Sequence, residues 1–448
     1  MEPWLAAALA YIPHWLEFQR RHLDQPGVAV AIDRRGETVL DRAFGVADLV
    51  TAEALTPDHR FRIASHSKAF TAAGTLRLKE RGLLRLDDPV GAYVDSLHPE
   101  VAAATLAQLL SHGAGLSRDG PDAGQFFERR AYLDEAELRA DLGLAPALER
   151  ATRFKYSNHG YALLGLVIEA VTDRPYEAWI RREVIAPTGL AETDPDIPAA
   201  PRPPLATGHG TVLPFGRRPR IPGRNPARAM APAAGFVATA RDVARFFGSL
   251  APEAERSVLS RESRREMTRR HWRDEPFGAE RHYGLGVIVG PPGPWAGFGH
   301  SGSFQGFLSR TVVVPEHGLA VTVLTNAIDG PAQAWTDGIL HILRGFQERG
   351  APAADLAGWS GRWWTLWGAH DLVPAGERVL VAAPAAVLPF ADAPEIAADG
   401  PASGRVARGH GFGSPGEEVR RKGDSLWIGG AELVTEERLR EEVAGRGA

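Results

Sequence analysis

The chain has 448 residues, of which 44% are apolar and 24% are charged, and its formal net charge is −4. This composition is typical of a soluble globular protein with two or three domains, and the small negative charge gives no electrostatic basis for binding nucleic acid. Cysteine is absent, which excludes disulfides, thiolate zinc sites and cysteine nucleophiles.

The N-terminal segment is apolar but makes a poor signal peptide, because it lacks a basic start and Pro13 interrupts it. No uncharged run approaches the ~20 residues that cross a bilayer. We therefore expect a cytoplasmic protein with no membrane partner. Residues 4–24 have the periodicity of an amphipathic helix.

The following residues predict the start of an antiparallel sheet and then a helical block. Residues 28–32 form an apolar run typical of a buried strand, and residues 38–45 return after a turn as its partner. A helix begins within residues 61–70 and should end at Gly82. Residues 66–195 are mostly helical by periodicity.

Residues 195–234 differ in kind, because ten prolines exclude regular structure there. So long an irregular segment is usually a functional loop or disordered. Its arginines could meet a substrate carboxylate, although a solvated basic loop is the simpler interpretation. These arginines are Arg217, Arg218, Arg220, Arg224 and Arg228.

Strands return after a helix expected at residues 240–250. Residues 283–289, 307–314 and 319–325 are predicted strands, the last two joined as a hairpin, and residues 333–345 form a closing helix. Because the strands of this sheet come from both ends of the segment, with a helical block between them, the pattern predicts an α+β fold.

The composition shifts after residue 350, where four tryptophans cluster and short apolar runs alternate with glycine and proline turns. This pattern predicts a small antiparallel β sandwich or barrel. We therefore expect a larger domain at residues 1–350 and a β domain at residues 351–448.

Ser65 and Lys68 are candidates for nucleophilic chemistry. Residues three apart on a helix are neighbours, so the Lys68 amine should lie one turn from the Ser65 hydroxyl. A serine needs a base to become a nucleophile, and a lysine is a base only where its surroundings lower its pKa. Arginine cannot replace it, and this chain has only four lysines. Taken alone, the pair also fits an exposed lysine on a surface helix.

Tyr156 and Asn158 supply polar groups that fit the same chemistry, since their spacing lets both side chains point the same way from an extended turn. A tyrosine beside a protonated lysine can become phenolate and act as a base. Asn158 offers an acceptor and a donor, enough to tie Lys68 to a substrate amide. Taken alone, the two residues also fit an ordinary turn.

The stretch 299–307 enters a predicted strand. His300 supplies a polar group where charge would develop, and Gly302 leaves room for another backbone to approach the strand closely. His282-Tyr283-Gly284 has the same His-x-Gly form, but we interpret it as part of the core of the preceding strand.

Ser65-x-x-Lys68, Tyr156-x-Asn158 and His300-x-Gly302, in that order, resemble the motifs of the serine β-lactamase and penicillin-binding-protein superfamily. The sequence is most similar to the branch that holds class C β-lactamases, D-alanyl-D-alanine carboxypeptidases, D-aminopeptidases and related esterases, because Tyr-x-Asn replaces Ser-Asp-Asn. The resemblance covers residues 15–345, and it implies an antiparallel sheet with an inserted helical subdomain.

The resemblance also implies roles for individual residues. Ser65 would be acylated, Lys68 and Tyr156 would share general acid and base work, and Asn158 would hold the substrate amide. The backbone N–H groups of Ser65 and Ser303 would form the oxyanion hole, beside a strand that takes up substrate as an added strand. The implied catalytic residues are Ser65, Lys68, Tyr156, Asn158 and His300, and the implied substrate-binding residues are Gly302, Ser303 and Gln305. No metal and no organic cofactor is implied.

One departure bears on the substrate. β-Lactamases usually carry a lysine where this chain has His300, which argues against efficient antibiotic hydrolysis. The C-terminal β domain resembles the lipocalin-like domain of some D-amino-acid-specific peptidases and of penicillin-binding-protein-type thioesterases, and it could reach the active site or serve packing or dimerisation.

We therefore expect a serine hydrolase acting on amide bonds of small peptides, with a preference for D-residues. An esterase, a peptide cyclase of the thioesterase type and a non-catalytic binding protein remain alternatives, and homo-oligomerisation stays open.

Overall fold

The computed structural model describes residues 1–198, 204–214, 216–221, 223–274, 280–290 and 295–445. The chain forms two compact units. One unit is Gln25–Gln333, and the other combines Met1–Asp24 with Ala334–Ala448.

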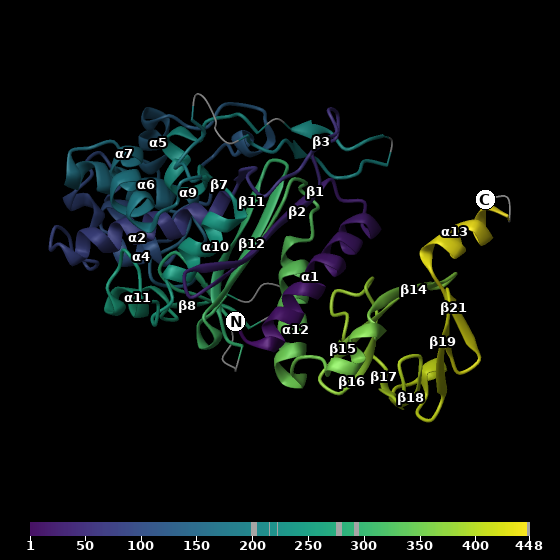
Figure 1. The fold of residues 1–448 in the computed structure, drawn as a ribbon. Coiled ribbons are helices and arrows are strands. Elements are labelled where there is room, and N and C mark those ends of the chain that lie inside the picture. Colours follow the sequence, from purple (N-terminus) through teal and green to yellow (C-terminus); the bar gives the residue numbers. More distant parts are fainter. Residues whose placement is uncertain (199–203, 215, 222, 275–279, 291–294, 446–448) are drawn as a thin grey trace. The chain divides into compact units, whose positions relative to one another are not determined.

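The unit Gln25–Gln333 is built on an antiparallel sheet, which in the described part of the chain has nine strands in the order β3-β2-β1-β13-β12-β11-β10-β9-β8 (Figure 1). The strands are β1 (Gly27–Arg34), β2 (Glu37–Asp48), β3 (Glu53–Ala54), β8 (Trp272–Arg273), β9 (His282–Tyr283), β10 (Ile288–Val289), β11 (Phe298–Phe304), β12 (Phe307–Val314) and β13 (Leu319–Thr325). Strands from both ends of the unit meet in the sheet, since Val28 of β1 lies opposite Thr325 of β13.

Helices cover this sheet and form a block beside it, as the sequence predicts. They are α2 (Ser67–Glu80), α3 (Pro99–Ala102), α4 (Leu106–Leu110), α5 (Glu135–Leu142), α6 (Asn158–Thr172), α7 (Tyr176–Ile180), α8 (Ala186–Thr188), α9 (Ala231–Ala234), α10 (Ala240–Ser249) and α11 (Arg261–Met267). α10 packs on β1 and β13, and its Phe246 and Phe247 rings are buried against Phe70 and His66. Figure 1 shows α2, α4, α5, α6 and α7 gathered beside the sheet.

α2 runs through the centre of the helical block, and its packing depends on small residues. A side chain at Gly74 would meet Ile180 Cδ1 at 2.6 Å, so the glycine allows the close approach of the following helices. Ala69, Ala72 and Ala73 are fully buried in the same helix. The chain therefore buries the helix that follows Ser65 on nearly all sides.

Residues 283–289 do not form one strand, which corrects the sequence prediction. They contain the β9–β10 hairpin, in which Tyr283 pairs with Ile288. The turn includes Gly286 at φ +77°, a conformation that favours glycine. An apolar run broken by two glycines fits a strand and a tight hairpin equally well, which is why the pattern was misleading.

The proline-rich segment is irregular apart from short pieces such as β5 (Gly208–His209) and β6 (Arg220–Ile221). Its basic residues are not uniformly solvated: Arg218 is paired with Asp329 and only 6% of its side chain is exposed, and Arg220 is paired with Asp48. Ion pairs to the end of β2 and to the segment after β13 thus hold part of this loop. Residues 199–203, 215 and 222 lie outside the described part.

The second unit contains two long helices and a barrel. α1 (Pro3–His22) and α12 (Ala332–Arg349) pack together, and Trp335 donates from Nε1 to Gln19 Oε1 at 3.2 Å. The strands are β14 (Gly361–Thr365), β15 (Gly368–Ala375), β16 (Arg378–Ala382), β17 (Glu395–Ala398), β18 (Ser403–Arg408), β19 (Glu418–Lys422), β20 (Ser425–Ile428) and β21 (Ala431–Val434), followed by α13 (Glu436–Ala444).

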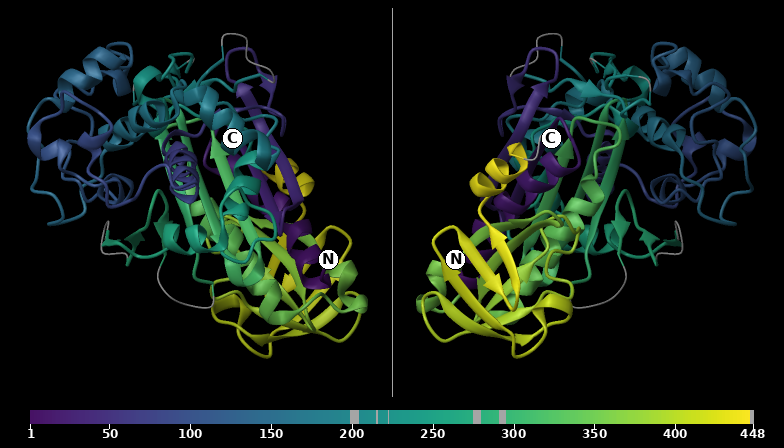
Figure 2. Two further views of the ribbon diagram at one scale, coloured as in Figure 1. Left: turned by 90° about the vertical axis from the view of Figure 1, so that its left-hand side faces the viewer. Right: turned by 90° about the vertical axis from the view of Figure 1, so that its right-hand side faces the viewer.

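These strands close an antiparallel barrel, because Trp364 of β14 pairs with Val434 of β21. Figure 2 shows the barrel strands, coloured green to yellow, from two sides. Trp359 and Trp363 are buried in its core with apolar residues of most strands. The predicted fold class is confirmed: an α+β unit with an antiparallel sheet and a C-terminal antiparallel barrel, consistent with a lipocalin-like domain. The domain boundary at residue 350 stays a prediction.

Within the described residues, no helix combines the length and the apolar character that a bilayer span requires.

Candidate active site

Ser65 lies in a 3-10 turn, Ala64–His66, that leads directly into α2. Ala64 has φ +50°, an uncommon backbone conformation for a residue with a side chain. His66 stabilises the turn through two hydrogen bonds of its ring, from Nδ1 to Ile63 O at 3.1 Å and between Nε2 and Thr311 Oγ1 at 2.9 Å. Ser65 is the one partly exposed residue between Phe61 and Leu76, so the turn presents its hydroxyl on an otherwise buried segment.

β11 runs directly against this turn at Gly302. A side chain at residue 302 would meet Ile63 O at 2.3 Å and Ala64 Cβ at 3.1 Å. Glycine at this position therefore permits the close approach of strand and turn, and it brings the His300-x-Gly302 segment beside Ser65.

Lys68 is completely buried beneath the Ser65 hydroxyl. Its Nζ atom lies 2.7 Å from Asn158 Oδ1, 2.8 Å from Ala233 O and 3.3 Å from Ser65 Oγ. Burial lowers the pKa of Lys68 well below its ordinary value, and the charge of Arg118 lowers it further while that of Asp119 opposes the shift. Burial of this site therefore favours the neutral form of the Lys68 amine, the form in which it can act as a base.

The three contacts of Nζ differ in what they can exchange with a neutral amine, which has two N–H donors and one lone pair. Asn158 Oδ1 and Ala233 O can only accept, so they take the two donors. The Ser65 hydroxyl can donate, and it is the contact that remains for the lone pair. The geometry therefore directs the basic electron pair of Lys68 toward the Ser65 proton.

Tyr156 contacts the same serine from another side. Its ring centroid lies 4.7 Å from Lys68 Nζ, and the Ser65 side chain is close enough to lower the pKa of the phenol. Burial raises the pKa of Tyr156, and the Ser65 side chain offsets this only in part. Burial therefore favours a neutral phenol and a neutral amine, and of the two groups Lys68 is the better proton acceptor.

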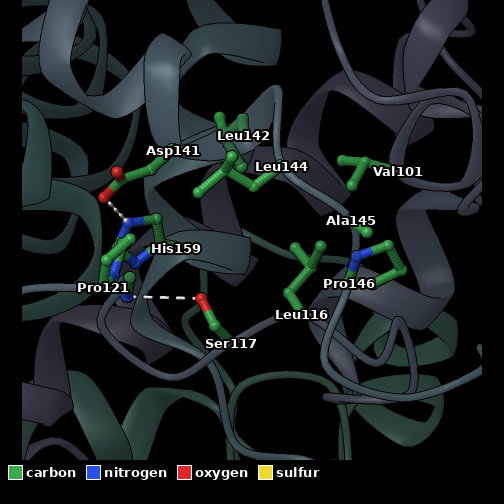
Figure 3. A pocket seen from close by; sticks show the side chains of 11 residues that line it. Val101, Leu116, Ser117, Pro121, Asp141, Leu142, Leu144, Ala145, Pro146 and His159 are labelled. Carbon is green, nitrogen blue, oxygen red and sulfur yellow. Dashed lines mark hydrogen bonds and ion pairs between the residues drawn. The ribbon is translucent and has the colours of Figure 1, made fainter.

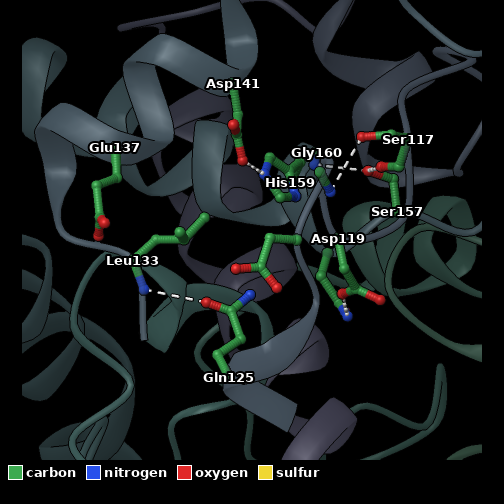
Figure 4. A network of polar contacts seen from close by, with 12 residues as sticks. Ser117, Asp119, Gln125, Leu133, Glu137, Asp141, Ser157, His159 and Gly160 are labelled. Atoms are coloured by element: carbon green, nitrogen blue, oxygen red, sulfur yellow. Dashed lines mark hydrogen bonds and ion pairs between the residues drawn. The ribbon is translucent and has the colours of Figure 1, made fainter. Parts of the chain in front are cut away.

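Asn158 is the first residue of α6, and Ser157 caps that helix by accepting from Gly160 N–H at 3.0 Å. The Asn158 side chain bridges two titratable groups: Oδ1 accepts from Lys68, and Nδ2 donates to Asp119 Oδ1 at 2.5 Å. Figure 4 shows Asp119 beside the start of this helix. Asp119 belongs to no motif in the sequence, and only the fold reveals it.

His112 is a second residue that the motifs do not identify as part of the site. It has φ +62° and follows the α4 helix. Its Nδ1 atom accepts from Ser157 N–H at 3.1 Å, and its ring centroid lies 4.2 Å from that of Tyr156. Burial lowers the pKa of His112 well below its ordinary value. This neutral ring is therefore a support for the Tyr156 segment.

His300 is buried on β11 and makes two hydrogen bonds that fix its tautomer. Nδ1 donates to Ser301 O at 2.6 Å, so Nε2 accepts from the Tyr283 hydroxyl at 2.9 Å. Burial lowers the pKa of His300 well below its ordinary value. The third motif thus contributes a neutral group to the site.

One edge of β11 is open beside Ser65. β10 pairs only with Phe298 and Gly299. On the other side, Phe304 pairs with Phe307 across a two-residue loop, so the backbone groups of Phe304 form hydrogen bonds with β12. Successive residues of a strand direct their backbone N–H and C=O groups to opposite edges. The N–H and C=O of Ser303 therefore face the open edge. In the described residues, the Ser65 N–H has no hydrogen-bond partner.

Gln305 lies differently from the other predicted substrate contacts. It is buried at the tip of the β11–β12 hairpin and donates from Nε2 to Gln125 O at 2.6 Å. Its amide thus joins the hairpin to the 3-10 turn Gly124–Phe127. Ser303, in contrast, is exposed.

A separate cavity of about 220 Å³ lies behind the loop that carries Asp119 (Figure 3). Its walls are mostly leucine, valine and proline, with His159 and Asp141 paired at 2.9 Å at one end. A side chain at Gly120 would meet Asp141 Oδ2 at 2.2 Å. The loop therefore rests on the His159–Asp141 pair, and the cavity itself holds none of the residues around Ser65.

Comparisons with known proteins agree with this geometry. A family model described as Beta-lactamase matches residues 17–343. Protein flp of Staphylococcus aureus is 28% identical over 181 residues, which cover 40% of this chain and 36% of that protein. The matched segment therefore spans only about a third of that relative.

Two solved structures share the fold. The octameric penicillin-binding protein homologue from Pyrococcus abyssi is 22% identical, with a TM-score of 0.66 over 95% of this chain and 99% of that chain. D-amino acid amidase from Ochrobactrum anthropi is 23% identical, with a TM-score of 0.66 over 75% of this chain and 99% of that chain. At these identities the two structures are evidence for the fold alone.

Proposed function

This chain belongs to the β-lactamase family, whose members are serine hydrolases, and on that premise we propose that it cleaves amide bonds of small peptides through an acyl-enzyme at Ser65. The observation that carries the proposal is the arrangement around Lys68 Nζ, where two acceptors occupy its donors and the Ser65 hydroxyl, 3.3 Å away, meets its lone pair.

In the proposed acylation, Lys68 takes the Ser65 proton while Ser65 Oγ attacks the substrate carbonyl carbon. The N–H groups of Ser65 and Ser303 stabilise the oxyanion. Tyr156 passes a proton to the leaving amine and recovers one from Lys68, so the C–N bond breaks with no net change on the enzyme apart from the acyl group. Water then attacks the ester, gives up a proton through the same pair and restores Ser65.

The neutral state of His300 supports a peptidase or amidase over a β-lactamase. A lysine at this position would offer a fixed positive charge to a substrate carboxylate, whereas a buried neutral histidine offers none. The open edge at Ser303 supports a peptide that binds as an added strand. We extend the proposal to a preference for D-residues by analogy with the D-amino acid amidase whose fold this chain shares.

The experiment is a substrate panel joined to a covalent label. We expect a fluorophosphonate to add once to the intact protein, at Ser65, and D-configured p-nitroanilides to be cleaved faster than their L-isomers. Ser65→Ala should abolish both reactions with an unchanged melting temperature, since one hydroxyl contributes little to stability.

Other outcomes would identify the alternatives. Faster turnover of p-nitrophenyl esters than of any anilide would identify an esterase. Ring product from a peptidyl thioester would identify a cyclase. Absence of both adduct and turnover would leave a non-catalytic binding protein.

We also propose a homo-oligomer, by analogy with the octameric homologue whose fold matches 95% of this chain. Light scattering coupled to size-exclusion chromatography measures this directly, and a mass near the 48.3 kDa of one chain would contradict it.

A further inference from the structure

We propose that Asp119 is a positioning residue that fixes the orientation of the Asn158 amide and thereby aims the Lys68 lone pair at Ser65. The inference rests on the proposed function of Ser65 and Lys68, and it assigns to the loop before α6 a part in setting the reactivity of the serine.

The two ends of the Asn158 amide are similar in size but opposite in hydrogen bonding, since the oxygen accepts and the NH2 group donates. With Oδ1 toward Lys68, the amine donates to Asn158 and keeps its lone pair for Ser65. With the amide reversed, Nδ2 would point at Lys68 and compete with the Ser65 proton for that lone pair. The orientation of one amide thus decides whether the base is available.

Asp119 selects the productive orientation. An ionised carboxylate accepts hydrogen bonds and cannot donate them. Its Oδ1 atom lies 2.5 Å from Asn158 Nδ2, so reversing the amide would bring two oxygens together. Nothing else bonded to the Asn158 side chain makes this distinction as strongly, because the neutral Lys68 amine can both donate and accept.

The loop is tied to α6 so that Asp119 keeps its place. Asn158 N–H donates to Arg118 O at 2.8 Å, and Ser157 Oγ donates to Ser117 O at 2.6 Å. Only 12% of the Asp119 side chain is exposed, whereas 66% of the Arg118 side chain is exposed, and the two pair at 3.1 Å. Figure 4 shows Ser117 and Asp119 together at the start of α6.

Asp119 is also the one anion that acts on Lys68 in the described structure. The group facing Lys68 from the same loop is Arg118. The rings facing it from other elements are those of Tyr156 and Tyr161, at 4.7 and 5.5 Å, and the neutral His112 and His300. Asp119 stabilises the protonated amine and Arg118 destabilises it, so the two residues move the pKa of Lys68 in opposite directions.

The test compares pH profiles of kcat/KM for the full chain and four variants on its best p-nitroanilide. The acidic limb reports deprotonation of the base in the free enzyme. Asp119→Asn removes the negative charge but keeps an acceptor for Asn158, so the acidic limb should move to lower pH with a small loss of plateau kcat/KM. Asp119→Ala removes the charge and the acceptor, so the acidic limb should again move to lower pH and the plateau kcat/KM should fall about tenfold or more.

Arg118→Gln should move the acidic limb in the opposite direction, to higher pH, because it removes a positive charge that lowers the pKa of Lys68. Asp122→Asn is the matched control: it removes a charge from the same loop, but Asp122 contacts Arg130 and Gly124 and does not act on Lys68. Its profile should match that of the unaltered protein. Melting temperatures of all four variants show whether a loss of activity comes from unfolding or from a changed orientation of the Lys68 lone pair in a folded protein.

An unmoved limb in an active, folded Asp119→Asn protein overturns the inference and leaves the proposed function intact. The same holds if Asp119→Ala keeps the full plateau rate. Failure of the proposed function has a different signature, because the unaltered protein would then show neither turnover nor a Ser65 adduct, and both proposals would be overturned together.

Discussion

The Tyr283 hydroxyl donates a hydrogen bond to His300 Nε2, with 2.9 Å between the two heavy atoms. The bond joins the β9–β10 hairpin to the strand that flanks Ser65. Because Nδ1 donates to Ser301 O, the histidine needs its second nitrogen to be an acceptor, and the tyrosine supplies the donor. A short hairpin that sequence patterns misassign thus fixes the tautomer of a residue in the site.

Tyr283→Phe should destabilise the fold and free His300 to titrate. Removing the tyrosine hydroxyl leaves His300 Nε2 buried without a donor, which costs about 1–3 kcal/mol of folding stability. The loss of that donor also destabilises the neutral form of the ring, so the pKa of His300 rises toward its ordinary value. Urea denaturation measures the first effect and NMR titration of the ring the second. An unchanged denaturation midpoint would contradict the assigned bond.

Acid should weaken the fold through buried histidines. Burial holds His112 and His300 neutral and lowers the pKa of His66 to about 3. Unfolded histidines titrate near pH 6.5, so below that pH the unfolded chain binds protons that the folded chain excludes, and the free energy of unfolding falls by ~1.4 kcal/mol per pH unit for each histidine. The loss extends from about pH 6.5 down to the folded pKa.

Carboxyl groups also titrate in this range, and Asp33, whose pKa burial raises to about 6, opposes the effect. The measurement is therefore a difference between two proteins. His300→Gln should show a shallower fall in unfolding free energy between pH 6.5 and pH 5 than the unaltered chain. Parallel curves would show that His300 is not held neutral.

Much of the site could be predicted from the sequence because its residues lie in short local patterns. Ser65 and Lys68 are one helical turn apart, and the helix after them has an apolar pattern. Tyr156 and Asn158 are two residues apart at a capped helix start. In each case local geometry alone brings the side chains near each other.

The other contacts of the site join segments that are distant in the sequence, and no local pattern encodes them. Asp119 reaches Asn158 across 39 positions of the chain. Gln305 follows the His300 motif and is predicted to contact substrate, and the fold adds a hydrogen bond from its amide to Gln125 O, 180 positions away. Only the packed fold defines such partners.

Lys68→Arg should remove nearly all turnover, because the guanidinium keeps its proton and cannot act as a base. Loss of general-base catalysis costs about 10²–10⁴-fold in kcat. Lys79→Arg is the matched control, since it makes the same change on the same helix at a half-buried lysine that pairs with Glu266 at 2.5 Å, a contact that arginine can also make. Comparable activity of the two variants would exclude Lys68 as the base.

Gly302→Ala should damage activity more than stability. The added carbon would meet Ile63 O at 2.3 Å and Ser309 Oγ at 2.4 Å. The serine hydroxyl can rotate away, but the carbonyl is backbone of the turn that precedes Ser65, so β11 or the turn must move. Overpacking of this kind costs about 1–3 kcal/mol, whereas a displacement of Ser65 by about 1 Å costs on the order of 10²-fold in rate.

Gly358→Ala, where an added carbon meets nothing within 4 Å, controls for the substitution itself. Denaturation and p-nitroanilide kinetics on both variants measure the two effects, and a Gly302→Ala enzyme with unaltered kcat/KM would show that β11 does not set the position of the serine.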